Sequence, residues 1–529
     1  MTARDDSRIV HGVIMLAAIG VAAFGVWKGS FVAGAGDPYG YVSQADLIAH
    51  GSLHVDQQFV RTLPWPFADW SFAPAGYRPG VARGTIVPVY PPGLPATMAV
   101  FQWIGGRQAV FYVVPLLAAL CVWMTSRLGA LVHGPLTGML AAVMVAASPS
   151  FLYQVVQPLS DVPATAWWTT ALVLALSNSG PAAFGAGVAA SAAILTRPNL
   201  VPLALVVAAY FIARLMRSRA RSEAVQLACF VAAVVPGCVA VAIVNNMLYG
   251  SPLKSGYEPF DTLYKLAHLG PNLTNYPRWL LQTQTPFIGL ALTAPWLLRR
   301  EPGSERSPMA AHVWMLLSFT AVVLLSYLFY TPFASHEWTV LRFLLPAYPA
   351  LLVLAVAVAV EGIGRVWSSR PRAIAVVVCL ALSAWLARES IQRGVLQVAP
   401  VERRYLDVGR HVAALMPGNA VFISHQHAGS IRYYSGRLTL NVRWLEPRWL
   451  DAAVKVLGEL GYHPLIALEA GEVEAFRARF GQQNALGQLD WPPMAEQADP
   501  VRVQIFDPAD RARFQRGEPV TTRPIAPAR

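Results

Sequence analysis

The chain has 529 residues, of which 55% are hydrophobic and 13% are charged, and its mean hydropathy is +0.43. This composition is typical of a protein embedded in a lipid bilayer and argues against an ordinary soluble protein. The formal charge of +12 does not indicate nucleic-acid binding, because the arginines occur in short groups between apolar segments. The 4 cysteines all fall in apolar segments without CxxC spacing, so they predict neither a metal site nor a disulfide framework.

The first predicted element is a membrane helix over Ile9–Trp27. Its apolar run has the length of about 20 residues that a spanning helix needs. The small residues "AGA" at 33–35 resemble a cleavage site, so a signal peptide is the alternative. We favour an uncleaved anchor, because the apolar run exceeds the roughly 7–15 residues of a signal peptide.

Polar residues follow this helix at once, in the stretch "GAGDPYGYVSQADLIAHGSLHVD" at 34–56. Asp37 precedes Pro38, and Gly51 comes about four turns later, which predicts a helix with Asp37 as its N-cap. This helix is too polar to span the bilayer, and Tyr41 lies on its apolar face, so we expect it to lie along the outer surface of the membrane domain. Asp37 is therefore either a helix cap or a carboxylate that meets a substrate embedded in lipid.

Ten further apolar segments bring the predicted number of membrane helices to about eleven. They are Gln108–Ser126, Leu136–Tyr153, Val162–Ser177, Pro181–Leu195, Pro198–Ala213, Val225–Leu248, Pro286–Leu298, Ala311–Tyr330, Phe343–Val360 and Ala373–Ala387.

Arginines cluster on one side of this arrangement, which the positive-inside rule makes cytoplasmic. They are Arg214, Arg217, Arg219, Arg221, Arg299, Arg300, Arg306, Arg365, Arg370 and Arg372. The alternation then predicts a multi-pass protein of the plasma (inner) membrane with a cytoplasmic N-terminus. The loops 28–107 and 249–285, and everything after about residue 390, are expected on the outer side.

The unusual polar residues gather on this outer side. Asp161, in "LSDVP", begins a predicted helix, where it is either a cap or a substrate contact. Each of the outer cations is either an interfacial or solvated side chain or a phosphate contact. The further candidates on this side are Arg78, Arg83, Arg197, Lys254, His336, Glu337 and Arg342.

After about residue 395 the hydrophobic runs shorten and begin to alternate, which predicts a soluble α/β domain. The expected elements are a helix to Leu415, a strand at 420–424, a helix at 447–460, a strand at 464–468, a helix at 472–480 and a strand at 501–506. We therefore predict a transmembrane domain over 1–395, with the long outer loop 28–107, and a soluble domain over 396–507. Residues 508–529 are rich in Arg and Pro, and we expect a mobile tail there.

Two motifs in the soluble domain have open interpretations. His425 and His427 follow a predicted strand and could point to one face, but two histidines without a third ligand do not predict a zinc site. The sequence "RYYSGR" at 432–437 is either a carbohydrate-contacting surface or an ordinary helix that packs its tyrosines.

Five motifs occur in an order that resembles a known family. An acidic residue follows the first membrane helix, and then come "YPPGLP" at 90–95, "QPLSDVPA" at 157–164, "TRPN" at 196–199 and "HEWTVLRFLLP" at 336–346. Over about residues 9–390 this order resembles the GT-C superfamily of integral-membrane glycosyltransferases. The likeness is closest to bacterial relatives of protein O-mannosyltransferases and of lipid A aminoarabinose transferases.

The resemblance implies a GT-C-like polytopic α-helical membrane protein that takes a sugar from a polyprenyl-phosphate carrier. Such enzymes pass the sugar to an envelope acceptor on the non-cytoplasmic side. The mannosyltransferases carry two adjacent acidic residues where this chain has Asp37 followed by Pro38. The sugar and the acceptor, whether lipid, glycan or protein, therefore stay open.

Chemistry and resemblance together assign roles to single residues. An acceptor hydroxyl must lose its proton as it attacks, so we predict Asp37 as the base, with Asp161 as a second catalytic candidate. The leaving lipid phosphate needs a cation, and by family analogy Arg342 supplies it. The other candidate substrate-binding residues are His336, Glu337, Tyr41, Arg78, Arg83, Arg197 and Lys254. We expect an inverting transferase that contacts membrane lipids but not nucleic acid, with no cofactor and no indicated divalent metal.

Two alternatives belong to other classes. A secondary transporter also has many apolar helices, but such folds usually show two similar halves, whereas the long outer loops and terminal domain are lopsided here. A GT-C-like protein without catalysis, serving in envelope assembly, is the second alternative.

Overall fold

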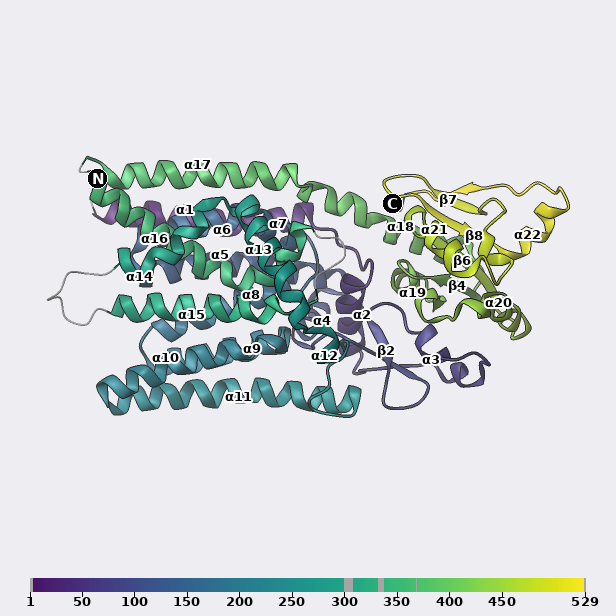
Figure 1. Ribbon diagram of the computed structural model, residues 1–529, viewed down its shortest axis with the longest axis horizontal. Coiled ribbons are helices and arrows are strands. Elements are labelled where there is room, and N and C mark those ends of the chain that lie inside the picture. The colour runs from purple at the N-terminus through teal and green to yellow at the C-terminus, as the bar shows by residue number, and fades with distance from the viewer. Residues whose placement is uncertain (1–2, 299–307, 332–336, 368, 528–529) are drawn as a thin grey trace.

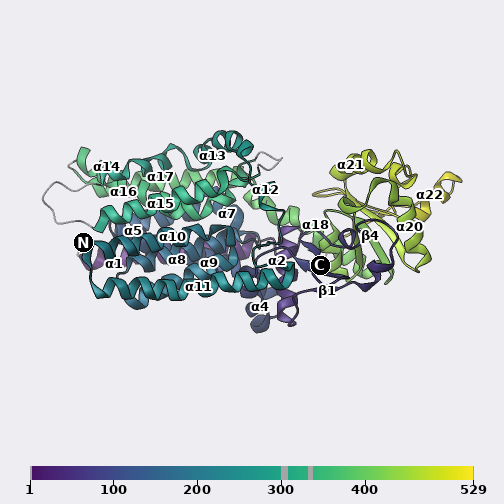
Figure 2. The ribbon, with the colours of Figure 1, turned by 60° about the horizontal axis from the view of Figure 1, so that its bottom comes forward.

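The computed structural model describes residues 3–298, 308–331, 337–367 and 369–527. A bundle of long helices makes up one end of the molecule, and a smaller α/β domain lies at the other (Figure 1). The view turned by 60° shows the same separation (Figure 2). The predicted combination of a helical membrane domain and a C-terminal α/β domain is therefore confirmed.

Apart from the long segment between α1 and α5, the helices of the bundle follow one another along the chain. They are α1 (Ala3–Lys28), α5 (Val113–Val132), α6 (Pro135–Ala147), α7 (Pro149–Val155), α8 (Asp161–Leu176), α9 (Gly180–Thr196), α10 (Pro202–Ser218), α11 (Arg221–Tyr249), α12 (Phe260–Leu263), α13 (Leu269–Gln284), α14 (Ala294–Leu297), α15 (Pro308–Leu328), α16 (Tyr348–Val366) and α17 (Pro371–Gln392). The 3-10 segments η5 (Pro286–Thr293) and η6 (Trp338–Ala347) lead into α14 and α16.

Fewer helices than predicted are long enough to cross a membrane. In the described parts of the chain, 7 helices have the necessary length and apolar composition, or 8 if the pair α6–α7, bent by 63°, counts as one span. The other predicted spans correspond to α8 with 16 residues, α9 with 17, and the short segment from Pro286 to Leu297. Helix α8 is almost wholly buried, whereas α9 and the segment Pro286–Leu297 also expose apolar side chains such as Phe184 and Trp296. Their composition is that of spanning helices, and only their length sets them apart.

Burial distinguishes the centre of the bundle from its lipid-facing surface. The apolar window of Trp338–Val366 is 89% buried inside the protein, whereas the window of Pro198–Ser218 is 22% buried. Small residues let some helices approach closely: a Cβ atom at Gly187 of α9 would lie 2.5 Å from the carbonyl oxygen of Phe230 in α11. The central helix thus packs against protein, and the peripheral helices present apolar side chains outward.

The Arg-rich turns lie at the end of the bundle opposite the α/β domain. The N-terminus and the turns between α10 and α11 and between α16 and α17 occupy this end (Figure 1). Arg299, Arg300 and Arg306 lie outside the described residues. The arginines and the α/β domain are thus at opposite ends, as the predicted topology requires, while the orientation in the membrane stays a prediction.

The segment between α1 and α5 is folded. It contains α2 (Asp37–Ala49), α3 (Ala68–Ser71), α4 (Gly93–Gly105) and a three-stranded antiparallel sheet of β1 (Val55–Asp56), β3 (Thr85–Pro88) and β2 (Tyr77–Pro79). Helix α2 buries Tyr41 and packs against α4. The segment fills the space between the bundle and the α/β domain.

The α/β domain is built on a six-stranded mixed sheet in the order β5-β4-β6-β8-β7-β9. Its elements are α18 (Val398–Leu415), β4 (Ala420–Ser424), α19 (Ala428–Ser435), β5 (Leu438–Asn441), α20 (Leu450–Glu459), β6 (His463–Glu469), α21 (Ala470–Phe480), β7 (Ala495–Gln497), β8 (Val503–Phe506), α22 (Pro508–Gln515) and β9 (Arg523–Pro524). The predicted strands correspond to β4, β6 and β8, and the predicted helices to α18, α20 and α21. Strands β5, β7 and β9 were not predicted, because they are short and two of them lie at the edges of the sheet.

The C-terminal tail contains elements that the sequence analysis did not predict. We expected residues 508–529 to be mobile, but the described part of this range forms α22 and β9. Strand β9 pairs in parallel with β7, and Ile525 is 5% exposed and donates its backbone N–H to Glu496. The composition of the tail does not reveal this backbone pairing, and its mobility stays a prediction.

Candidate active site

A cavity of about 1830 Å³ lies where the bundle, the segment between α1 and α5, and the α/β domain meet. Most of the predicted site residues line it. They are Asp37, Tyr41, Arg78, Asp161, Arg197, Lys254 and Arg342. Residues predicted from motifs that are far apart in the sequence are therefore brought together in one place.

Asp37 begins α2, but it does not cap the helix. The N-cap residue is Gly36, and no side-chain capping bond is present. The carboxylate instead accepts one hydrogen bond from the Tyr90 hydroxyl at 2.7 Å on Oδ1 and one from Arg342 at 3.0 Å on Oδ2. The N-cap interpretation of Asp37 is therefore wrong, since Asp37 is the first residue of the helix and its side chain makes no capping bond.

The backbone before Asp37 is held by the α/β domain. The Ala33 amide donates a hydrogen bond to the Tyr434 hydroxyl of α19 at 2.8 Å. A Cβ atom at Gly34 would lie 2.4 Å from the ring of Tyr405 of α18, so only glycine permits this approach. The tyrosines of "RYYSGR" thus pack in an interface, and the α/β domain fixes the loop that carries Asp37.

The Asp37–Arg342 ion pair faces the cavity. The Asp37 side chain is 39% exposed and the Arg342 side chain 23% exposed. Burial, reinforced by the charge of Asp37, raises the pKa of Tyr90 well above its usual value, so the phenol stays protonated as a donor. The carboxylate is held by two donors and still has accessible surface.

A second ion pair joins Asp161, the first residue of α8, to Arg197, which directly follows α9. Arg197 donates to Asp161 Oδ1 at 2.6 Å and to the Ser160 hydroxyl at 3.2 Å, and Tyr41 donates to the same hydroxyl at 2.8 Å. The Asp161 side chain is 1% exposed, and it makes no capping bond to α8. The pair therefore joins the start of α8 to the end of α9 at the wall of the cavity.

The other predicted residues have different surroundings. Arg78 donates to the carbonyl groups of Ser255 and Gly256 at 3.4 and 3.3 Å, so it also holds a loop of the cavity wall. Lys254 is exposed and lines the cavity. Arg83 and Glu337 are exposed residues outside its lining, and His336 lies outside the described residues.

The α/β domain contributes residues that the sequence analysis did not assign to the site. They are His425, Asn441, Arg443 and Trp444. Tyr90 was missed as well, although it belongs to the "YPPGLP" motif. The motif could have indicated Tyr90 as a site residue. The four residues of the α/β domain lie at or just after the short strands β4 and β5, where the sequence has no recognisable motif.

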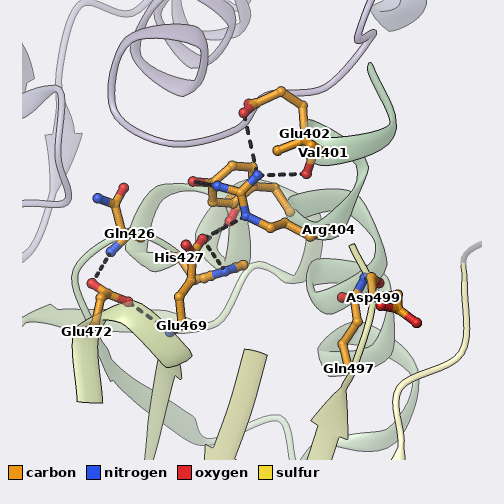
Figure 3. Close-up of polar contacts among 11 residues, drawn as sticks. Val401, Glu402, Arg404, Gln426, His427, Glu469, Glu472, Gln497 and Asp499 are labelled. Atoms are coloured by element: carbon orange, nitrogen blue, oxygen red, sulfur yellow. Dashed lines mark hydrogen bonds and ion pairs between the residues drawn. The ribbon is translucent and has the colours of Figure 1, made fainter. Parts of the chain in front are cut away.

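A buried charged network lies where α18 meets the end of β6 (Figure 3). Arg404 donates to Glu469 at 2.7 Å and lies 3.6 Å from Glu402. His427 is fully buried with Nε2 at 3.2 Å from Glu469, although it is not aligned for a hydrogen bond. Burial opposes ionisation, but His427 and Arg404 lower the pKa of Glu469 to about 2. His427 therefore faces this network and His425 faces the cavity, so the two histidines do not share a face.

No group of three or more His, Cys, Asp or Glu side chains among the described residues could hold a metal ion. The expectation of a reaction without a metal stays a prediction.

Comparisons with known proteins reveal likeness only at the level of structure. No family model and no curated protein matches the sequence. The apo structure of ArnT from Cupriavidus metallidurans, a lipid A aminoarabinose transferase, is 13% identical with a TM-score of 0.57, and the match covers 94% of this chain and 98% of that chain. ArnT bound to undecaprenyl phosphate is 13% identical with a TM-score of 0.53, over 90% of this chain and 96% of that chain.

An oligosaccharyltransferase from Archaeoglobus fulgidus in the apo form is also similar. It is 11% identical with a TM-score of 0.55, and the match covers 90% of this chain and 72% of that chain. Both neighbours are GT-C superfamily members. At these identities the likeness shows the fold, so the chain has the GT-C fold that its motifs predicted.

Proposed function

We propose that this chain is a membrane glycosyltransferase that moves a sugar from a polyprenyl-phosphate carrier to an envelope acceptor. The observation that carries the proposal is the partly open Asp37 carboxylate, held by Tyr90 and Arg342 at the wall of a large cavity between membrane and α/β domains. The chain-wide likeness to ArnT, whose structure is known with undecaprenyl phosphate, supports a lipid-linked donor.

The reaction is a single displacement. The acceptor oxygen attacks the anomeric carbon, its proton passes to Asp37, and the bond from that carbon to the phosphate oxygen breaks. The electron pair stays on the leaving polyprenyl phosphate, and attack from the opposite face inverts the configuration. Two fixed donors keep the Asp37 carboxylate oriented toward the cavity without occupying all its lone pairs.

Arg342 has a second task in this proposal. In the unliganded arrangement it donates to Asp37, and a phosphate entering the cavity competes for the same guanidinium. A guanidinium has five N–H donors, so it can bind phosphate and still touch Asp37. Binding of the donor thus weakens the hydrogen bond from Arg342 to Asp37. The carboxylate is then a better acceptor for the proton of the attacking hydroxyl.

Some of the remaining candidates hold the walls of the cavity in place, and others can contact the substrate. The ion pair of Asp161 and Arg197 holds α8 and α9 together, and Tyr41 of α2 joins them through its hydrogen bond to Ser160. The exposed Lys254 lines the cavity, where it can meet phosphate, while Arg78 holds the loop at Ser255 and Gly256 beside it. The substrate-binding proposals are Tyr41, Arg78, Arg83, Arg197, Lys254, His336 and Glu337. Asp161 stays the second catalytic candidate, and no cofactor is invoked.

The orientation proposal has its own test. With the native cysteines replaced, a cysteine at the exposed Lys455 position of the α/β domain should react with an impermeant thiol reagent from outside the cell. A cysteine at the exposed Arg217 position should react only after the cells are opened. The reverse pattern would put the α/β domain in the cytoplasm and contradict the proposed sidedness.

The transfer activity is tested with the purified protein in lipid nanodiscs. Radiolabelled polyprenyl-phosphate sugars are offered with an envelope extract, and label should pass to an acceptor. Uptake of free solute into sealed vesicles without transfer would favour a secondary transporter. Donor binding without transfer to any extract fraction would favour the non-catalytic assembly protein.

A further inference from the structure

The cavity wall formed by the α/β domain carries a cluster of polar and aromatic side chains away from the ion pairs. His425 follows β4, and Asn441 ends β5. Trp444 belongs to the 3-10 turn η8 (Val442–Trp444). Trp70 of α3 meets this turn from the segment between α1 and α5, and all four residues line the cavity.

The amide of Asn441 has a fixed orientation. Its Nδ2 donates to the Ala73 carbonyl at 3.3 Å, and its Oδ1 accepts the Arg443 backbone N–H at 3.1 Å. Oδ1 also lies 3.0 Å from His425 Nδ1. Because this oxygen can only accept, the hydrogen of the imidazole must be on Nδ1.

The imidazole of His425 therefore presents a lone pair to the cavity. Burial, with a further contribution from the charge of Arg443, lowers the pKa of His425, so the ring is neutral at physiological pH. In a neutral ring with the hydrogen on Nδ1, Nε2 is an acceptor. His425 Nε2 has no protein partner among the described residues and is not among the buried, unsatisfied atoms.

Two indole rings line the same cavity, and one of them belongs to η8, which directly follows the Asn441 that fixes His425. The centroids of Trp70 and Trp444 are 4.5 Å apart with an interplanar angle of 42°, and both side chains are half-buried. Neither indole N–H has a hydrogen-bond partner among the described residues, and the guanidinium of Arg443 lies 5.9 Å from the ring of Trp444. The cluster thus combines apolar faces, N–H donors and one fixed acceptor.

This combination matches the chemistry of a sugar ring. A pyranose presents an apolar C–H face that packs on aromatic rings, and hydroxyl groups that both donate and accept. A phosphate or carboxylate would instead be repelled by a bare imidazole lone pair. The cluster is thus suited to a neutral, hydroxylated ring.

We propose that His425, Trp70 and Trp444 form a subsite that binds a sugar ring of the acceptor. Assignment to the acceptor rests on the proposed function, in which the lipid donor enters from the membrane and meets Arg342. The subsite is built by the α/β domain and α3, which lie farther from the bundle (Figure 1). The acceptor is then a glycan or glycolipid whose sugar hydroxyl donates to His425 Nε2.

Binding is measured by saturation-transfer NMR on the full chain in nanodiscs. The probes are methyl glycosides of N-acetylglucosamine, galactose, mannose and rhamnose at millimolar concentration, together with oligosaccharides released from the envelope by mild acid. At least one probe should receive saturation at its ring protons. His425→Phe and Trp444→Ala should each weaken its affinity by about tenfold, the loss of one hydrogen bond or one stacking contact.

Further variants separate recognition from misfolding. His425→Gln restores an acceptor and should recover part of the affinity, and Trp444→Phe should keep more than Trp444→Ala. His411→Phe changes a half-buried histidine of α18 that does not line the cavity, so it should leave binding unchanged. Absence of a signal from every probe, or equal binding in wild type, His425→Phe and Trp444→Ala, would overturn the subsite.

The donor is the other source of a sugar ring, and the same variants distinguish it. Weaker binding of a polyprenyl-phosphate sugar, but not of polyprenyl phosphate, in His425→Phe would assign the subsite to the donor and overturn the acceptor assignment. Failure of the proposed function appears separately, as absence of transfer while the sugar signal and its loss in the variants persist.

Discussion

Two Asp–Arg pairs lie in the same cavity, and they differ mainly in how far water reaches them. Asp161 is 1% exposed and Arg197 11% exposed, whereas Asp37 is 39% exposed and Arg342 23% exposed. A buried pair must keep both partners, because either charge alone would be left without solvent. A partly open pair can exchange a partner for a substrate without that cost.

Sequence order does not reveal this difference. Both acids begin a helix after a short loop, and both were interpreted as caps or substrate contacts. Neither makes a capping bond, since each meets an arginine from a distant segment. We therefore expect substitutions at Asp37 to affect turnover and substitutions at Asp161 to affect stability.

The largest effect is expected for Asp37→Asn. Asparagine keeps the size of the side chain and can accept hydrogen bonds, but it cannot take a proton at neutral pH. Turnover should fall by roughly two to four orders of magnitude, the usual contribution of general acid–base catalysis. The measurement is transfer of radiolabelled sugar from the polyprenyl-phosphate donor.

The control variants are Asp37→Ala and Asp46→Asn. Because Asp37 makes no capping bond, Asp37→Ala should lose activity without losing helix stability beyond the Asn variant. Asp46, on the same helix, pairs with the 60% exposed Arg107, so its loss should have little effect. Near-normal transfer by Asp37→Asn would show that this residue is structural.

The next effect is on stability, in Asp161→Asn. The substitution leaves the Arg197 guanidinium largely buried without a counter-charge, which costs about 3–5 kcal/mol of unfolding free energy. Thermal and denaturant unfolding in detergent measure it. Replacing both residues by leucine should recover much of the stability, because an apolar pair needs no solvation.

An exposed pair in the α/β domain is the control for that comparison. Glu446 pairs with Arg448, whose side chain is 68% exposed, so Glu446→Gln should cost at most about 1 kcal/mol. If Asp161→Asn were as stable as wild type but inactive, Asp161 would be a catalytic residue and the contrast between the pairs would be lost.

A smaller effect is expected for Arg342→Lys. Lysine keeps the charge but replaces the planar fork by a point charge, so the lipid phosphate loses about one charge-assisted hydrogen bond. Affinity for polyprenyl phosphate should fall by about 10- to 100-fold. Arg448→Lys is the control, since Arg448 is 68% exposed and does not line the cavity. Unchanged donor affinity and turnover in Arg342→Ala would remove Arg342 from the mechanism.

The sequence predicted the fold class and much of the cavity, because hydropathy and motif order depend on local residues. It predicted Asp37 and Arg342 as neighbours in function, although 305 positions separate them. It predicted about eleven spans, whereas 7 helices of the described residues, or 8 with the bent pair, have the length and composition to cross a membrane, because hydropathy does not fix where a helix begins and ends.

Other parts of the site were hidden for physical reasons. The roles of His425 and Trp444 depend on how β4 and β5 dock against the segment between α1 and α5, and no local pattern encodes this contact. Likewise, the motif contains Tyr90, but only tertiary packing aims its hydroxyl at Asp37. The elements of the tail were not predicted, because backbone pairing of β9 needs no apolar pattern.

The smallest effect concerns the contact that ties the open pair to the α/β domain. Tyr434 accepts the hydrogen bond of the buried Ala33 amide, four residues before Asp37. Tyr434→Phe removes this acceptor, so the loop should lose its fixed position while the ring packing is kept. The turnover number should fall by about 3- to 10-fold, equivalent to one ordinary hydrogen bond, with unchanged KM for the donor.

The neighbouring tyrosine provides the matched control for this last prediction. The Tyr433 ring lies 5.3 Å from the guanidinium of Arg107, and its hydroxyl makes no hydrogen bond among the described residues. Tyr433→Phe should therefore leave turnover unchanged. If Tyr434→Phe also kept full turnover, or if it raised the KM for the donor alone, the α/β domain would not position Asp37. The open pair would then be held by Tyr90 and the bundle without help from the α/β domain.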